Sequence, residues 1–255
     1  MWRRLLTAGA AVSLLSVSGG GCGSSGRGRP QVTVFAAASL RQAFTSYAQT
    51  FGRARVRLSL AGSDQLAAQI QQGVHPDVFA SADRERAQAL FAARLVERPV
   101  PFATNRLVIA VPSGSSRLHT LSDLARPGVK LAIGSPSVPV GAYTRQVLSR
   151  LPARQAASIM ANVRSQEPDV SGIVGKLTQG AVDGGFLYAT DVRAASSSLR
   201  TIELPAALAP QVVYAVAAVR GAPHPALARA FVAGLLRGRG HTALAQAGFG
   251  PPPAG

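Results

Sequence analysis

The sequence is poor in the residue types on which several common functions depend. Its 255 residues contain one cysteine, Cys22, which excludes an internal disulfide and leaves no thiol nucleophile in the folded part. Aromatic residues make up only 5% of the chain, too few for a surface that stacks nucleic-acid bases. The four histidines lie far apart and lack the spacing of a metal site. The patterns G-x-S-x-G and G-x-x-x-x-G-K-S/T are absent, which argues against a hydrolase elbow and against ATP hydrolysis by this chain.

Acidic residues are also scarce. The chain has 11 aspartates and glutamates against 27 lysines and arginines, for a formal net charge of +16. The excess comes almost entirely from arginine, since Lys130 and Lys176 are its lysines. A basic chain could bind nucleic acid, but these arginines are scattered and form no continuous block. We therefore interpret the charge as a solvated surface and expect no nucleic-acid partner, while the 47% of hydrophobic residues suffices for a proper core.

Long hydrophobic runs are missing, with one short exception near the start. Leu5–Val17 is apolar but too short to span a bilayer, and two arginines precede it, which is typical of a secretory signal. Small residues then lead to Cys22, as in a bacterial lipoprotein signal, although Gly19 stands where that pattern prefers a larger apolar residue. We expect a signal peptide at 1–21, lipidation of Cys22 and a flexible tether at 22–30; simple cleavage nearby is the alternative.

The remaining chain is organised in repeated strand–turn–helix units. Gln31–Phe35 reads as a buried strand, Ser39 follows it as a helix N-cap, and an apolar stripe with helical spacing continues to Phe51. Similar units recur in two blocks, and two terminal helices could return to the first block. The sequence therefore predicts an α/β fold of two lobes, 31–104 plus 220–255 and 105–219, with a ligand cleft at the carboxyl ends of the strands.

Four helix starts share the same chemistry. Each presents hydroxyl groups, free backbone N–H groups or both at the positive end of a helix dipole, which suits an anion. A tyrosine at the end of a later strand provides a fifth polar group. Neutral donors of this kind could hold an unprotonated oxyanion and reject one that carries a proton, because a buried charge needs many partners. The helix starts are centred on Ser39, Ser63, Val140 and Val170, and the tyrosine is Tyr188.

An ordered set of segments resembles the periplasmic molybdate-binding proteins of ABC transporters, which have the type II periplasmic-binding-protein fold. That fold has two lobes, each a mixed, mostly parallel sheet flanked by helices, with the ligand cleft between them. The resemblance runs from about Val32 to Phe249. Its main segments are Phe35–Leu40, Ala61–Ser63, Pro76–Asp83, Asn105–Pro112, Val138–Pro139, Asp169–Val170 and Gly185–Asp191.

The resemblance implies a function and a set of site residues. It implies that the hydroxyls of Ser39, Ser63 and Tyr188 and the amides of Val140 and Val170 bind molybdate or tungstate, with no cofactor and no enzymatic activity. It further implies delivery to an ABC permease with its ATPase by a monomer. We expect this monomer in the periplasm or on the outer face of the cytoplasmic membrane, held there by a lipid anchor.

Three positions depart from the family pattern and leave alternatives open. Asp64 stands where a small hydroxyl residue is usual, Val140 replaces an alanine, and Ser171 replaces a common arginine. These departures allow a different oxyanion or a small organic acid as the ligand. Ser63 alone also fits a plain helix cap, and Tyr188 alone fits a core tyrosine. A secreted α/β hydrolase is the alternative from another class, but the sequence offers no nucleophile–base pair in a recognisable context.

Overall fold

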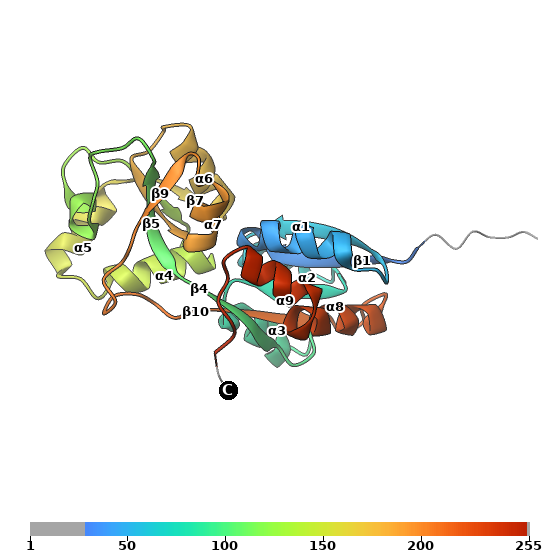
Figure 1. The fold of residues 1–255 in the computed structure, drawn as a ribbon. Coiled ribbons are helices and arrows are strands. Elements are labelled where there is room, and N and C mark those ends of the chain that lie inside the picture. Colours follow the sequence, from blue (N-terminus) through green and yellow to red (C-terminus); the bar gives the residue numbers. More distant parts are fainter. Residues whose placement is uncertain (1–28, 254–255) are drawn as a thin grey trace, which may run out of the picture.

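The computed structural model describes residues 29–253 and folds them into two lobes, each built on a five-stranded sheet (Figure 1). The predicted signal peptide at 1–21, the lipidation site Cys22 and most of the 22–30 tether lie outside the described residues. Helices flank both sheets, so the predicted two-lobed α/β fold is confirmed. In the part of the chain that the structure describes, no helix combines the length and the apolar character needed to cross a bilayer.

The first sheet has the strand order β2-β1-β3-β10-β4. β1 pairs with β2 and β3 in parallel, and β10 is antiparallel to both β3 and β4. The strands are β1 (Gln31–Ala37), β2 (Arg55–Ala61), β3 (Val78–Ser81), β4 (Val100–Asn105) and β10 (Val212–Ala218). The helices of this lobe are η1 (Ala38–Leu40), α1 (Arg41–Thr50), α2 (Ser63–Gln71), α3 (Arg84–Ala92), α8 (Pro225–Arg237) and α9 (Arg239–Gln246).

The second sheet repeats this topology in the order β7-β6-β8-β5-β9. β6 is parallel to β7 and β8, and β5 is the antiparallel strand next to the edge. The strands are β5 (Leu107–Pro112), β6 (Leu131–Gly134), β7 (Val163–Glu167), β8 (Gly184–Tyr188) and β9 (Leu199–Ile202). The helices are η2 (Leu121–Ala125), α4 (Pro139–Leu148), α5 (Ala153–Ala161), α6 (Val170–Thr178) and α7 (Ala189–Ala194).

The chain crosses between the two lobes twice, and the position of the second crossing corrects the predicted boundary. The chain leaves the first sheet along its edge strand β4 and enters the second as β5; it leaves the second along β9 and returns as β10 (Figure 1). Assigning 212–219 to the second lobe was therefore wrong, because β10 is hydrogen-bonded to β3 and β4 of the first sheet. The edge strands β4 and β9, which border the two crossings, were not predicted.

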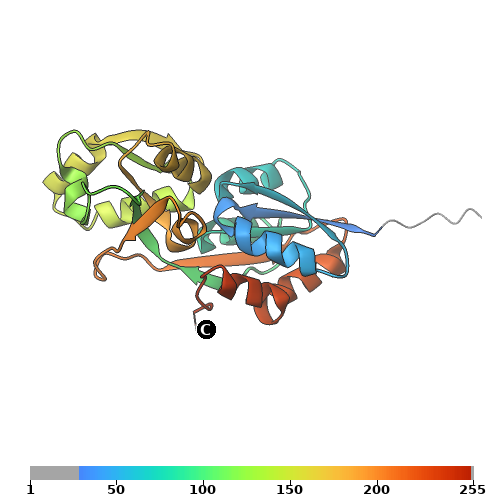
Figure 2. The same cartoon turned by 45° about the horizontal axis from the view of Figure 1, so that its top comes forward.

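The C-terminal helices complete the first lobe. Figure 2 shows the red helices α8 and α9 beside the blue helix α1. Phe231 of α8 packs edge-on against Phe44 with ring centroids 5.8 Å apart, and lies 4.6 Å from the ring of Tyr47. All three side chains are at most 3% exposed, so they form one buried aromatic cluster. The described part of the chain thus starts and ends in the first lobe, and the strand ends that face the other lobe remain free to build a site.

Candidate functional site

Turns from both lobes meet around one small cavity. In each lobe the turns follow the carboxyl ends of parallel strands, which is where ligands bind in open α/β sheets. The cavity has a volume of about 20 Å³, room for a group of a few heavy atoms, since one water needs roughly 10–15 Å³ by the same measure. Its lining residues are Ala37, Ala38, Ser39, Ala61, Gly62, Ser63, Ala82, Val138, Pro139, Val140, Asp169, Val170 and Tyr188.

All five residues predicted from the sequence line this cavity. The first lobe contributes Ser39 and Ser63, and the second contributes Val140, Val170 and Tyr188. Val140 and Val170 lie in the first turns of α4 and α6, whose N–H groups have no acceptor inside their own helices. The structure therefore brings the predicted donors together, and their role in binding an oxyanion stays a prediction.

The two serines do not cap their helices, contrary to the expectation for Ser39. Ser39 lies inside η1, and Gly62 rather than Ser63 is the N-cap of α2; neither helix has a side-chain cap bond. The Ser63 hydroxyl instead accepts a 3.1 Å hydrogen bond from the Ala82 N–H. An N–H can only donate, so Ser63 has its own proton left to donate into the cavity.

Tyr188 lines the same cavity and has a buried hydroxyl. The side chain is 1% exposed, and among the described residues its hydroxyl has no hydrogen-bond partner. Burial raises the pKa of Tyr188 well above its ordinary value of 10.0, so the hydroxyl stays protonated and can donate. A buried hydroxyl without a partner costs free energy, and a ligand acceptor would remove that cost.

The cavity offers an anion neutral donors and helix dipoles rather than a cation. Among its described lining residues there is no lysine, arginine or histidine, and the one acidic residue is Asp169. The Asp169 carboxylate caps α6 by accepting a 2.6 Å bond from the Ser171 N–H. Asp64, a departure from the family pattern, does not line the cavity. Nor do the described residues contain a cluster of three or more acidic, histidine or cysteine side chains that could hold a metal ion.

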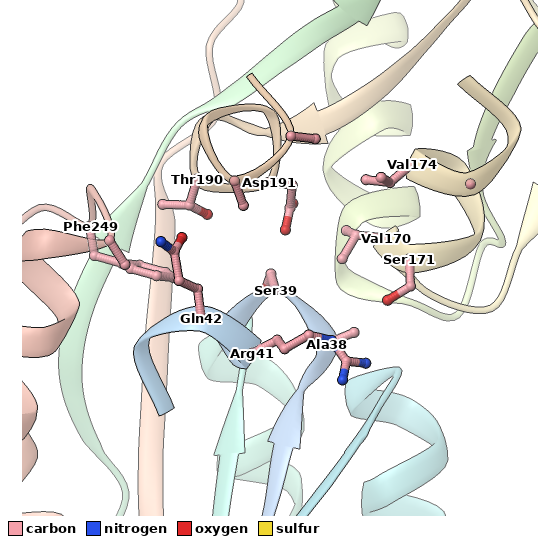
Figure 3. A pocket seen from close by; sticks show the side chains of 14 residues that line it. Ala38, Ser39, Arg41, Gln42, Val170, Ser171, Val174, Thr190, Asp191 and Phe249 are labelled. Carbon is pink, nitrogen blue, oxygen red and sulfur yellow. The ribbon is translucent and has the colours of Figure 1, made fainter. Parts of the chain in front are cut away.

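A larger pocket of about 390 Å³ adjoins the cavity at Ser39 and Val170. Figure 3 shows Thr190 and Asp191 of α7 extending into it from the second lobe, toward Ser39 of the first. Its lining is mostly small or apolar, and Asp191 is its acidic group. Burial, helped by the negative charge of Asp169, raises the pKa of Asp191 to about 7, although the Tyr188 N–H bond to the carboxylate opposes this shift.

Sequence reasoning missed two residues next to the site, one that contacts Ser39 and one that bridges the lobes. Tyr214 is fully buried in β10, and its hydroxyl lies 2.8 Å from the Ser39 Oγ. Arg86 of α3 reaches the other lobe, where its Nη2 donates a 2.6 Å bond to the Ser137 carbonyl, just before the α4 turn. Neither residue has a distinguishing sequence pattern: Tyr214 lies in an uninterrupted apolar strand, and Arg86 is one of many scattered arginines.

The two-lobed fold, with a small cavity between the lobes, is that of a solute-binding protein. Residues 32–250 match the family of bacterial extracellular solute-binding proteins, so the chain belongs to that family. Within it, the chain is 35% identical over 232 residues to the molybdate-binding protein ModA of Mycobacterium tuberculosis (strain ATCC 25618 / H37Rv), over 89% of this chain and 87% of that protein.

Solved structures share the fold. The periplasmic molybdate-binding protein of Azotobacter vinelandii superposes with a TM-score of 0.76 at 20% identity, covering 87% of this chain and 100% of that one. The sulfate-binding protein SubI of Mycobacterium tuberculosis H37Rv superposes with the same TM-score of 0.76 at 17% identity, covering 87% of each chain. Proteins named for two different tetrahedral oxyanions therefore share this architecture.

Proposed function

We propose that this protein captures molybdate, with tungstate as a close substitute, in the interlobe cavity and delivers it to an ABC permease. The hydroxyls of Ser39, Ser63 and Tyr188 and the amides of Val140 and Val170 donate to the oxyanion. The lobes close on the ligand and present it to the permease, whose ATPase drives transport. The protein itself binds and releases the anion as a monomer and carries out no reaction on it.

The buried hydroxyl of Tyr188 carries this proposal. It is buried without a partner among the described residues, and Tyr188 lines the cavity of about 20 Å³. Val140 and Val170, whose first-turn amides have no acceptor inside their own helices, line the same cavity. A small dianion supplies several acceptors at once, so it would pair all of these donors. The 35% identity to a molybdate-binding protein over 89% of the chain supports molybdate as that dianion.

Calorimetry on the mature chain, residues 22–255, tests the ligand directly. We expect tight binding of molybdate and tungstate, weaker binding of sulfate, and little binding of phosphate. Absence of tight binding by any of these oxyanions would refute the proposal.

A pair of tyrosine variants separates binding from folding. Tyr188→Phe keeps the buried ring but removes the unpartnered hydroxyl, so the ligand-free protein should unfold no more easily. Molybdate affinity should fall about 10- to 100-fold, because a hydrogen bond to a charged group contributes about 1.5–3 kcal/mol. The control Tyr47→Phe removes a 3.1 Å bond to the Phe231 carbonyl far from the cavity. It should lower the free energy of unfolding by about 1 kcal/mol and leave the affinity unchanged.

We further propose that Cys22 is lipidated after removal of residues 1–21 and holds the protein at the outer face of the cytoplasmic membrane. Residues 22–30 then act as the tether between the lipid and the first lobe. Mass spectrometry of the membrane-extracted protein should find an acylated amino-terminal cysteine, and Cys22→Ala should release the protein from the membrane. An unmodified, soluble wild-type protein would contradict this anchor.

One observation favours a second candidate, a small organic acid. The 390 Å³ pocket beside Ser39 and Val170 would accommodate a carbon skeleton attached to an anionic group in the small cavity. A competition series of sulfate, phosphate and short carboxylates against molybdate distinguishes the candidates. Displacement of molybdate by a carboxylate at similar concentration would favour the organic acid.

A further inference from the structure

A chain of buried hydrogen bonds connects Ser39 to the crossing between the lobes. The Ser39 Oγ lies 2.8 Å from the Tyr214 hydroxyl, which lies 3.4 Å from the Nδ2 of Asn105. The same Nδ2 donates a 2.8 Å bond to the Thr190 hydroxyl. Asn105 is the last residue of β4, where the chain leaves the first lobe, and Thr190 belongs to α7 of the second. All four side chains are at most 9% exposed, so these hydrogen bonds are shielded from water.

The donor in each of these hydrogen bonds follows from groups that can only donate. The Arg106 N–H donates a 2.9 Å bond to the Oδ1 of Asn105, which fixes the orientation of the amide. Its Nδ2 therefore faces Tyr214 as a donor, and the phenol oxygen accepts. Tyr214 must then direct its own proton at the oxygen of Ser39, and Ser39 has its proton left to donate into the cavity. Burial raises the pKa of Tyr214 well above 10.0, so the phenol keeps this proton.

Both serine hydroxyls are thus held by internal donors. By this deduction Tyr214 donates the 2.8 Å bond to Ser39, and the Ala82 N–H donates to Ser63. A hydroxyl whose oxygen already accepts from the protein turns its hydrogen toward the ligand. It then meets a ligand oxygen as a donor, and a ligand O–H at that position would face another hydrogen. Such an arrangement favours oxyanions that carry no proton.

We propose that Tyr214, oriented by Asn105, is a specificity-determining residue that holds the Ser39 hydroxyl as a donor and thereby excludes protonated oxyanions. This inference rests on the proposed function, because it assigns the origin of selectivity in the same cavity. Tyr214 acts through Ser39. Without the Tyr214 hydroxyl, Ser39 could rotate and accept a hydrogen bond from a ligand O–H.

The test compares molybdate with phosphate, which carries a proton at neutral pH, in the variant Tyr214→Phe. We expect the affinity for molybdate to fall about tenfold, as for loss of one orienting hydrogen bond. Affinity for phosphate, measured by competition, should stay the same or rise, so the molybdate-to-phosphate ratio should fall at least tenfold. If Tyr214 had only a structural role, the variant would lower the affinity for both anions by the same factor and leave the ratio unchanged.

Two further variants make the test decisive. Tyr47→Phe removes another buried tyrosine hydroxyl, so it should lower stability and leave the ratio at the wild-type value. Asn105→Asp keeps the shape but replaces the amide donor with an acceptor, so the Tyr214 proton should turn away from Ser39 and the ratio should fall again. At a pH well above the second pKa of phosphate, where phosphate is a dianion like molybdate, the added charge repels both ligands and cancels in the ratio. An unchanged ratio in Tyr214→Phe overturns the inference alone, whereas a wild-type protein that binds no oxyanion overturns the proposed function together with it.

Discussion

Gly62 provides a direct test of lobe closure, because it lines the cavity in the first lobe and lies close to residues of the second lobe. A Cβ added at Gly62 would lie 2.5 Å from the Pro168 carbonyl oxygen and 3.3 Å from a Val138 methyl group, both in the other lobe. The backbone at Gly62, with φ −59° and ψ 139°, suits alanine equally well. Gly62→Ala should therefore leave the folding of each lobe nearly unchanged and obstruct the closed arrangement.

The expected magnitude follows from the geometry. Ordinary contact begins at 3.4 Å, so the lobes would have to part by about 0.9 Å at Pro168. That movement carries the amides of Val140 and Val170 away from an anion held by Ser39 and Ser63. Each amide bond to a charged ligand contributes about 1.5–3 kcal/mol, and weakening both should cost about 3 kcal/mol. Molybdate affinity should then fall about a hundredfold.

Calorimetry with molybdate measures this loss, and thermal unfolding of the ligand-free protein checks the fold. The added Cβ would also lie 2.7 Å from the Asp64 carboxylate in the same lobe, so Gly62→Ala is compared with the double variant that also carries Asp64→Ala. The loss should persist in the double variant. Gly114→Ala is the matched control, since nothing lies within 4 Å of its added Cβ. Wild-type affinity in Gly62→Ala would refute the reasoning that closure brings these surfaces into contact.

Two other predictions concern charged groups around the cleft. Arg86→Ala removes the 2.6 Å bond to the Ser137 carbonyl and should raise the dissociation rate of molybdate about tenfold in stopped-flow measurements; Arg84→Ala, an exposed neighbour on the same helix, should not change it. Burial raises the pKa of Asp191 from 3.8 to about 7, so between these values the folded protein holds a proton that the unfolded chain releases, and the free energy of unfolding falls as pH rises. Asp191→Asn, which keeps an acceptor for the Tyr188 N–H, should flatten that fall in denaturant titrations, and an unchanged slope would contradict it.

The position of the site could be predicted from the sequence because it depends on local order. Ser39, Ser63, Val140 and Val170 each follow a strand and lie near the start of a helix, and parallel strands bring such turns to one edge of a sheet. The direction of each hydroxyl could not be predicted, since it depends on distant partners. The hydrogen-bond partner of Ser39 is Tyr214, 175 positions away on strand β10. Local pattern therefore locates the donors, and tertiary packing orients them.

The prediction of the lobe boundary failed for a related reason. Every residue of β10 is buried, so its sequence shows no alternation that distinguishes one sheet from the other. Its membership in the first sheet is decided by pairing with β3 and β4, and β4 itself gives a weak signal because Pro101 interrupts it. The predicted boundary between 104 and 105 falls close to the true crossing, because the chain passes there from β4 of one lobe to β5 of the other.

Two features between the lobes are separate from the proposed ligand donors. Gly62 has no side chain and so leaves room for the Pro168 carbonyl, and Arg86 donates to the Ser137 carbonyl. Both features favour the closed arrangement whatever anion the cavity holds. The apparent affinity of a site that binds only when closed scales with the closed fraction. Variants at these positions should therefore change the affinity for molybdate and for sulfate by the same factor, whereas Tyr214→Phe should change the ratio between molybdate and phosphate.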